Sequence, residues 1–199
     1  MRPSSKTKIL QAAVRVTERH GITALTLEAA AEEAGLTKPG LMYHFHTRDD
    51  LLIAIMRHLI EAWEEQLLTK LGKPLEQSTA QERAAAYVRV NAHGSASRAE
   101  LAFMVESATS SELAQVWNDL MARWVAQPSV PDPAQLDLFL ARLAADGLWL
   151  FEATRPAPLA PEVKEALIRR IAALTEPRPD APVPGPAQPI STRKPQVQP

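Results

Sequence analysis

The stretch from residue 25 to residue 52 constrains the fold of this chain more than any other feature. It reads LTLEAAAEEAGLTKPGLMYHFHTRDDLL, and its pattern predicts two short helices joined by a tight turn and followed at once by a longer helix. Thr26, Thr37 and Thr47 stand where a hydroxyl would accept a hydrogen bond from the first turn of each helix. Gly35 stands where the first short helix would end in the left-handed conformation. The second short helix is too small and too polar for a core element, but it fits the major groove of DNA.

The second short helix combines two apolar anchors with side chains that suit DNA. Leu41 and Phe45 lie four residues apart and are expected to face a small core. The N-terminus of a helix carries partial positive charge and free N–H groups, so it attracts phosphate. Phosphate contacts set the register of a protein on DNA, whereas contacts with base edges specify sequence. Lys38 against a guanine edge, and Pro39 or Met42 against a thymine methyl, are the candidate readers of sequence.

These residues closely resemble the DNA-binding head of the TetR family of bacterial transcription regulators. The signature that carries the resemblance is Gly35-Leu36-Thr37-Lys38-Pro39, then Leu41, Tyr43-His44-Phe45, Thr47-Arg48-Asp49 and Leu51, within residues 4 to about 60. The resemblance implies that the helix-turn-helix, at about residues 26–45, and the residues beside it contact DNA. The candidate contact residues are Thr26, Thr37, Lys38, Pro39, Gly40, Met42, Tyr43, His44 and Arg48.

Several of these residues have a specific expected role. Tyr43 and His44 can donate hydrogen bonds to phosphate oxygens, Gly40 lets the backbone approach the DNA closely, and Arg48 would hold the DNA backbone on the far side. Outside this signature, a tyrosine and a histidine on a short helix are more often surface or packing residues. The chain departs from the family pattern at Gly40 and Met42, where many members have a hydroxyl residue and an aromatic residue. Two hydrogen bonds are thereby lost, which bears on the operator sequence more than on DNA binding.

Composition limits the class of protein and its compartment. A length of 199 residues favours one or two domains, and 46% hydrophobic residues suffice for a sizeable core. The chain has no cysteine, which excludes disulfides, thiol nucleophiles and cysteine-ligated zinc. No apolar run has the length of a membrane span, and the first residues, MRPSSKTK, lack the apolar stretch of a signal peptide. We therefore expect a cytoplasmic protein without membrane partners. Because the net charge is only -1, DNA binding must depend on locally placed basic residues, namely Arg2, Lys6, Lys8, Lys38 and Arg48.

The rest of the pattern predicts an all-α protein, with no convincing strand alternation. The predicted helices are at 5–20, from Thr47 to about 71, from Ser78 or Thr79 to about 93, near 98–108, from Ser110 or Ser111 to about 125, at 133–154 and at 162–174. An N-terminal DNA-binding domain (1–50) is thus joined by a long helix to a helical regulatory and dimerisation domain (51–175). The tail, 176–199, holds eight of the 17 prolines and is predicted to be disordered and extended.

The two last predicted helices, 133–154 and 162–174, carry more apolar surface than one small body can hide. In the resembled family, the corresponding pair joins its twin from a second subunit in a four-helix bundle. The alternative is that these residues are simply core. We favour a homodimer through these helices, because one recognition helix contacts too few base pairs and two heads can read a palindromic operator.

The middle of the chain is rich in aromatic and methionine residues, as ligand pockets commonly are. The resemblance favours a small-molecule effector that binds there, although a stripe of this kind is more often ordinary core. No cofactor is expected. By hypothesis, the effector favours a conformation in which the long helix swings and the heads no longer match the operator. The candidate effector-binding residues are Trp63, Tyr87, Asn91, Phe103, Met104, Trp117, Met121, Trp124 and Trp149.

Two other classes of function compete with a DNA-binding regulator. The sequence has no metalloprotease motif, phosphate loop, dinucleotide fingerprint or nucleophile elbow, which disfavours an enzyme. His58 and Glu61 lie one turn apart and could form half of a metal site, but with no evident second half a surface pair is favoured. A helical protein-interaction module would explain the helices and the tail but not the head signature. Repression released by a small molecule follows from the resemblance, and the residues are equally compatible with an activator that takes no ligand.

Overall fold

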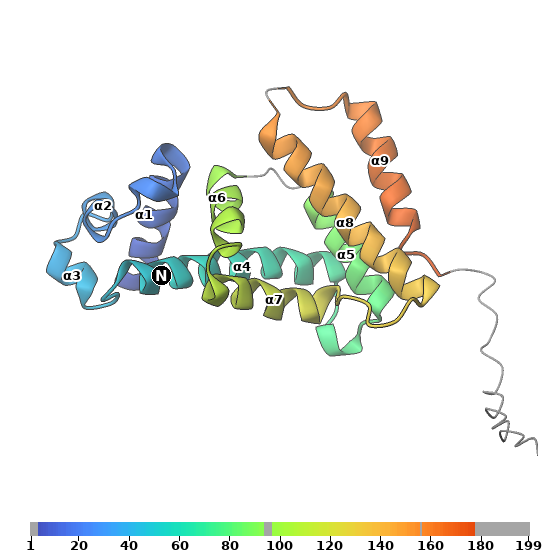
Figure 1. The fold of residues 1–199 in the computed structure, drawn as a ribbon, viewed down its shortest axis with the longest axis horizontal. Coiled ribbons are helices and arrows are strands. Elements are labelled where there is room, and N and C mark those ends of the chain that lie inside the picture. Colours follow the sequence, from blue (N-terminus) through green and yellow to red (C-terminus); the bar gives the residue numbers. More distant parts are fainter. Residues whose placement is uncertain (1–3, 94–96, 156, 178–199) are drawn as a thin grey trace, which may run out of the picture.

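A computed structural model describes residues 4–93, 97–155 and 157–177, and these residues form helices, turns and loops without a strand. Figure 1 shows the N-terminal helices at one end, a long helix that leads away from them, and a larger helical body around its other half. The helices are α1 (Ser5–His20), α2 (Leu27–Glu33), α3 (Lys38–Met42), α4 (Arg48–Leu71), α5 (Ala80–His93), α6 (Arg98–Ser107), α7 (Ser111–Trp124), α8 (Pro133–Thr154) and α9 (Pro161–Ala173). The predicted all-α fold, with a helix-turn-helix head and a C-terminal helical domain, is confirmed.

The helix boundaries follow from capping residues. The hydroxyl of Thr26 accepts a hydrogen bond from the Ala29 N–H at 3.0 Å. Thr47 forms a full capping box with Asp50, in which each side chain bonds the other residue's backbone N–H at 3.0 Å. The α2–α3 turn uses Gly35 at φ +66°, a conformation that favours glycine. Local chemistry therefore places the helix ends near the positions expected from the sequence.

The core of the head is small and made by side chains of all four N-terminal helices. On α1, Ile9, Ala13 and Val16 are buried and lie at helical spacing on one side of the helix. Leu41 of α3 and Phe45, which lies three residues after the end of α3, are also buried, so apolar anchors hold both the short helix and the turn that follows it. The expectation that these two side chains face the core is confirmed.

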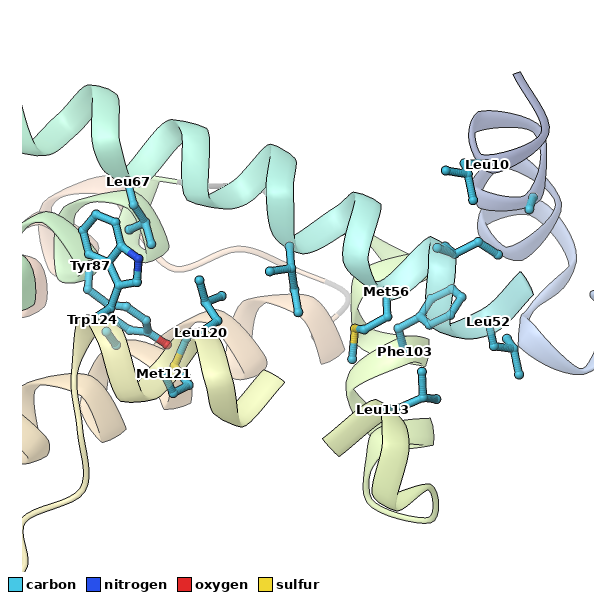
Figure 2. Close-up of a cluster of buried hydrophobic side chains, with 14 of the residues drawn as sticks. Leu10, Leu52, Met56, Leu67, Tyr87, Phe103, Leu113, Leu120, Met121 and Trp124 are labelled. Carbon is cyan, nitrogen blue, oxygen red and sulfur yellow. The ribbon is translucent and has the colours of Figure 1, made fainter. Parts of the chain in front are cut away.

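Helix α4 continues from the head into the second body without interruption. Figure 2 shows Leu10 and Leu52 at one end of a buried cluster, and Tyr87 and Trp124 at the other end. Met56 lies between these ends. The predicted domain boundary, between residues 50 and 51, falls inside α4, and buried side chains follow one another along α4 on its C-terminal side. The head and the second body thus share one apolar core.

Two short 3₁₀ turns, Ile22–Ala24 and Leu75–Gln77, were not predicted. They close connections of a few residues, and a single turn has no periodicity to reveal it. None of the described helices is both long enough and apolar enough to cross a lipid bilayer. Most of the Pro-rich tail, from residue 178 onward, lies outside the described residues, so its predicted disorder stays a prediction.

Candidate DNA-binding head and effector cavity

Helix α3 presents its polar and exposed residues away from the head core. Its N-cap is Thr37, whose hydroxyl accepts a hydrogen bond from the Gly40 N–H at 3.3 Å. Met42 is exposed, and Tyr43 is 83% exposed. The rings of Tyr43 and His44 meet edge to face, with centroids 5.2 Å apart. The Tyr43 side chain lies outside the core of the head, so its phenolic O–H is available to a partner outside the head.

Gly40 has a structural role in addition to any close approach to DNA. A Cβ added to Gly40 would lie 3.2 Å from the hydroxyl oxygen of Thr37. This oxygen is the cap of α3, so a larger residue at position 40 would press on the hydrogen bond that starts the helix. The departure from the family pattern at this position is compatible with a tightly wound first turn.

The charge of Lys38 is shared with a carboxylate of the same head. Its ammonium forms an ion pair with Glu28, which lies in the first turn of α2. The hydrogen bond from Lys38 lowers the pKa of the Glu28 carboxyl below its ordinary value. Both side chains are largely exposed, so water screens the pair and it is weak. A contact between Lys38 and DNA would therefore compete with Glu28.

Arg48, which is expected to hold the DNA backbone, is hydrogen-bonded inside the head. Its Nε donates to the carbonyl oxygen of Leu25 at 2.9 Å, and its Nη2 donates to the carbonyl oxygen of Ile22 at 3.0 Å. These carbonyls belong to the connection between α1 and α2. The planar fork of a guanidinium suits two acceptors on one strand of backbone. Arg48 thus ties this connection to the start of α4.

A carboxylate from the head also caps a helix of the second body. The two carboxylate oxygens of Glu18, on α1, accept hydrogen bonds from the backbone N–H groups of Arg98 at 3.1 Å and Ala99 at 2.7 Å. These N–H groups begin α6, where the helix dipole favours negative charge. Glu100, three residues after the N-cap Ser97, completes a capping box at the same end. The contact joins α1 directly to α6, in addition to their shared attachment to α4.

A cavity of about 370 Å³ lies in the second body. Five of its helices, α4 to α8, supply the lining residues. Seven of the nine candidate effector-binding residues lie on its wall: Trp63, Tyr87, Asn91, Phe103, Met104, Trp117 and Trp149. The remaining lining residues are Met56, Leu59, Ile60, Gln66, Val90, Ser97, Glu100 and Asp146. A volume of this size lies at the small end of the range typical of ligand pockets.

Met121 and Trp124 are not among the cavity-lining residues, which corrects their selection as ligand contacts. Both are buried in the core. The indole Nε1 of Trp124 donates to a carboxylate oxygen of Glu64 at 2.9 Å, and the guanidinium of Arg123 binds the same carboxylate. Helical spacing places Trp117, Met121 and Trp124 near one another on α7, but only Trp117 faces the cavity.

The cavity has a polar wall centred on Asp146, which the sequence analysis missed. Its Oδ1 accepts hydrogen bonds from the Tyr87 hydroxyl and from Asn91 Nδ2, the latter at 2.8 Å. Burial raises the pKa of the Asp146 carboxyl, although these hydrogen bonds and the charge of Arg142 act to lower it. Burial, together with the charge of Asp146, raises the pKa of Tyr87 well above its ordinary value. Asp146 is one of three acidic residues on α8, with Asp137 and Glu152, so the sequence carried no signal that singled it out.

An apolar surface covers the outward sides of α8 and α9. Figure 1 shows this pair at the end of the molecule opposite the head. The buried residues Ala141, Ala145 and Leu148 of α8 face the rest of the body. The exposed large apolar residues of the pair are Leu136, Leu140, Leu143, Leu150, Phe151, Val163 and Leu167. A surface of this kind usually marks an interaction site.

Comparison with known proteins agrees with this arrangement. The family model described as bacterial regulatory proteins, tetR family, matches residues 9–55, and the model described as tetracyclin repressor-like, C-terminal domain, matches residues 81–176. The chain is 34% identical over 92 residues to the HTH-type transcriptional regulator BetI of Brucella anthropi, which is 46% of this chain and 45% of the relative. The matched part therefore spans less than half the length of that curated relative.

Solved structures resemble nearly the whole described fold. The putative transcriptional regulator SCO7518 from Streptomyces coelicolor A3(2) has a TM-score of 0.65 at 18% identity, over 87% of this chain and 99% of that chain. The multidrug binding protein EbrR, solved in complex with malachite green, has a TM-score of 0.62 at 19% identity, over 86% of this chain and 98% of that chain. At identities this low, the structural likeness shows a shared fold and nothing more specific.

The fold and the head define a helix-turn-helix transcriptional regulator. The two family models cover the head and most of the second body, and the chain belongs to the TetR family of bacterial transcriptional regulators.

Proposed function

We propose that this chain is a homodimeric repressor that binds a palindromic operator and is released from it by a small molecule. The observation that carries the proposal is the course of α4. This helix begins at the capping box beside α3, and Met56, Ile60 and Trp63, further along it, line the cavity. A ligand that changes the position of α4 in the cavity also changes the position of the head. Binding of DNA places the protein in the cytoplasm.

The proposed DNA surface is the exposed side of the helix-turn-helix. Thr37, Lys38, Pro39, Gly40, Met42, Tyr43 and His44 belong to it by sequence, and Leu41 and Phe45 support it from the core. Lys38 and Tyr43 would bind phosphate or base edges. Thr26 is the N-cap of α2, and we propose that it also contacts the DNA backbone at this end of the helix. Arg48 is left out, because its guanidinium serves the head itself.

The proposed dimer interface is the apolar surface of α8 and α9. The exposed leucines of this pair gain from burial in proportion to the area removed from water. A two-fold axis through this surface would make the same patch face itself and would place two heads on two half-sites. A small head that reads only a few base pairs needs this duplication for a specific site.

The proposed release mechanism uses two connections between the cavity and the head. One is α4 itself. The other is α6, which lines the cavity through Phe103 and Met104 and is capped at its N-terminus by Glu18 of the head. A ligand that binds one arrangement of α4 and α6 better than the other shifts the population toward that arrangement. The relatives support an effector of this kind to the extent that EbrR was solved with a bound small molecule.

The experiment that tests the proposal is a titration of DNA from upstream of the chain's own gene and its neighbours, with competitor DNA at two salt concentrations. We expect tight, competitor-resistant binding to one fragment that weakens with salt. Tyr43→Ala should weaken it by about 1 kcal/mol, roughly fivefold, whereas Val105→Ala, an exposed change on α6, should not. Absence of specific binding to every fragment would contradict the proposal.

A transcription assay with the bound fragment separates repression from activation. We expect the protein to lower transcript from the promoter that carries the operator. A rise in transcript would identify an activator and would overturn the repressor proposal while leaving DNA recognition intact.

A further inference from the structure

The charge of the cavity wall is one-sided. Two carboxylates line it, Asp146 from α8 and Glu100 from α6. Among the described residues that line the cavity, none is a lysine, an arginine or a histidine. A partly buried carboxylate whose charge is only partly compensated is unfavourable, so an occupant that carries positive charge would be favoured over a neutral or negative one.

The nearest internal cation compensates Asp146 only in part. Arg142 Nε forms an ion pair with Asp146 Oδ2 at 3.6 Å, which is beyond hydrogen-bonding distance, and this buried Nε has no hydrogen-bond partner within the described residues. Arg142 Nη1 instead donates to the carbonyl oxygen of Val125 at 3.0 Å, and the guanidinium lies over the ring of Phe139. The positive charge is therefore directed partly to other groups outside the cavity wall.

Aromatic rings surround the same space. Trp63 stands between Tyr87, at 5.2 Å between ring centroids, and Trp117, at 5.9 Å, and Trp149 lies on the wall as well. The face of an indole ring attracts a cation through its quadrupole, and this attraction grows when water is excluded. Aromatic rings together with carboxylates form the usual surroundings of an organic ammonium group.

We infer that the cavity binds an organic cation, such as a quaternary or protonated ammonium that carries apolar groups, with its charge toward Asp146 and Glu100 and its apolar groups against the tryptophans. The inference rests on the proposed function in one respect only, namely that this cavity is the effector site. The inference concerns the positive charge and the apolar groups of the ligand, which a nutrient and a toxic amphiphile can have in common.

The test compares three probes with one skeleton and different charge. Benzyltrimethylammonium is the cation, neopentylbenzene is its neutral carbon isostere, and phenylmethanesulfonate is an anion of similar size. Binding to the full chain without DNA is measured by tryptophan fluorescence and calorimetry. We expect the cation to bind at least about tenfold more tightly than the neutral isostere, and the anion not to bind. Equal binding of cation and isostere, preference for the anion, or no binding of the cation would overturn the inference.

Variants assign the effect to the cavity. Asp146→Asn and Glu100→Gln should each weaken cation binding about tenfold while the affinity for the neutral isostere stays the same. Glu165→Gln, the same change on the exposed part of α9, should alter neither. If Asp146→Asn does not fold, as judged by circular dichroism, Glu100→Gln and the three wild-type titrations still decide. If both Glu100→Gln and a folded Asp146→Asn bind the cation as tightly as the unsubstituted chain does, the inference is overturned.

The ligand class and the effector role fail in different ways. Operator DNA is added as a separate step, and its release is measured with each probe. A cation that binds the cavity but leaves the protein on DNA supports the ligand class and contradicts the effector role. A neutral or anionic probe that binds more tightly and releases DNA supports the effector role and overturns the ligand class.

Discussion

At the scale of single residues, two basic side chains of the head are held by different kinds of partner. Lys38 and Arg48 are both basic residues of the helix-turn-helix signature. Lys38 is held by a weak, exposed ion pair with Glu28, whereas Arg48 is held by two backbone carbonyls. The first interaction can be exchanged for phosphate at little cost, and the second cannot, because it would leave carbonyl oxygens unsatisfied.

Replacing Glu28 should release Lys38 for DNA. We expect Glu28→Gln to tighten operator binding and to make the slope of log affinity against log salt steeper by about one phosphate contact. The control is Glu32→Gln, which removes the same charge from an exposed position on the same helix. Equal effects of the two substitutions would show that overall charge, and not the ion pair with Lys38, governs the change.

Replacing Arg48 should affect stability first. Arg48→Ala removes two hydrogen bonds to backbone carbonyls, so we expect the free energy of unfolding to fall by about 1–3 kcal/mol. Denaturant unfolding measures this, with the exposed Arg57→Ala on the same helix as control. A variant of unchanged stability whose operator binding has a shallower salt slope would instead restore Arg48 as a phosphate contact.

The raised pKa of Asp146 should make cation binding depend on pH. A bound cation favours the ionised carboxylate, so binding releases a proton and affinity rises as pH rises through the raised pKa of the free protein. The groups that face Asp146 are Tyr87 and Asn91 from α5 and Arg142 from its own helix. Tyr87 stays neutral over this range because its pKa is raised. Glu100 is the other carboxylate of the wall.

Calorimetric titration of benzyltrimethylammonium from weakly acidic to neutral pH checks this expectation. Asp146→Asn should flatten the profile, and Glu100→Gln separates any contribution of the second carboxylate. Affinity that falls as pH rises would contradict the assignment.

At the scale of elements, the attachment of α6 to the head is a feature that no local sequence pattern predicts. The Glu18 carboxylate caps the N-terminus of α6 across the boundary between the two bodies. It supplies negative charge where the helix dipole is positive and satisfies two N–H groups that a helix leaves without intrahelical partners. The position of α6 is thereby linked to the position of α1.

Removing this carboxylate should loosen the start of α6. We expect Glu18→Ala to lower the free energy of unfolding by about 1 kcal/mol and to speed hydrogen exchange at the amides of Arg98 and Ala99. Hydrogen exchange followed by mass spectrometry or NMR measures this, with Glu61→Ala on the exposed side of α4 as control. Unchanged exchange at these two amides would show that Glu18 does not hold α6 in solution.

At the scale of the whole molecule, the head and the apolar α8–α9 surface lie at opposite ends, with the cavity between them. This order suits a dimer in which the α8–α9 pair fixes the subunits and the heads move. The exposed leucines on α8 alternate with residues buried against α5, so the helix has two apolar sides. A helix on the surface of a monomer needs only one apolar side, the side that packs on the core.

Charge placed on the α8–α9 surface should separate the subunits. Leu140 is 52% exposed, so Leu140→Glu should leave the subunit folded but convert a dimer into a monomer and greatly weaken operator binding. Analytical ultracentrifugation measures the mass, and Val105→Glu, at a 63% exposed position on α6, is the matched control. A monomeric wild-type protein, or a dimer that survives Leu140→Glu, would refute the proposed interface.

Some features of this protein follow from the sequence alone because they depend on neighbours along the chain. Capping residues such as Thr47 and left-handed glycines such as Gly35 act within one or two turns, so they fix where α2, α3 and α4 begin or end. Leu41 and Phe45, four residues apart, likewise identify the two apolar anchors of this segment. Seven of the nine candidate ligand residues line the cavity. The candidates are aromatic, methionine and polar residues in the middle of the chain, and the cavity wall is built mainly from residues of these kinds.

Other features were decided only by the tertiary structure, because they join residues far apart in the sequence. Arg48 finds carbonyls more than twenty residues away, and Glu18 finds α6 across eighty residues. Asp146 becomes the polar centre of the cavity only when α8 packs against Tyr87 and Asn91 of α5. Helical periodicity places a side chain on a side of its helix, but which helix lies opposite is set by packing of the whole chain.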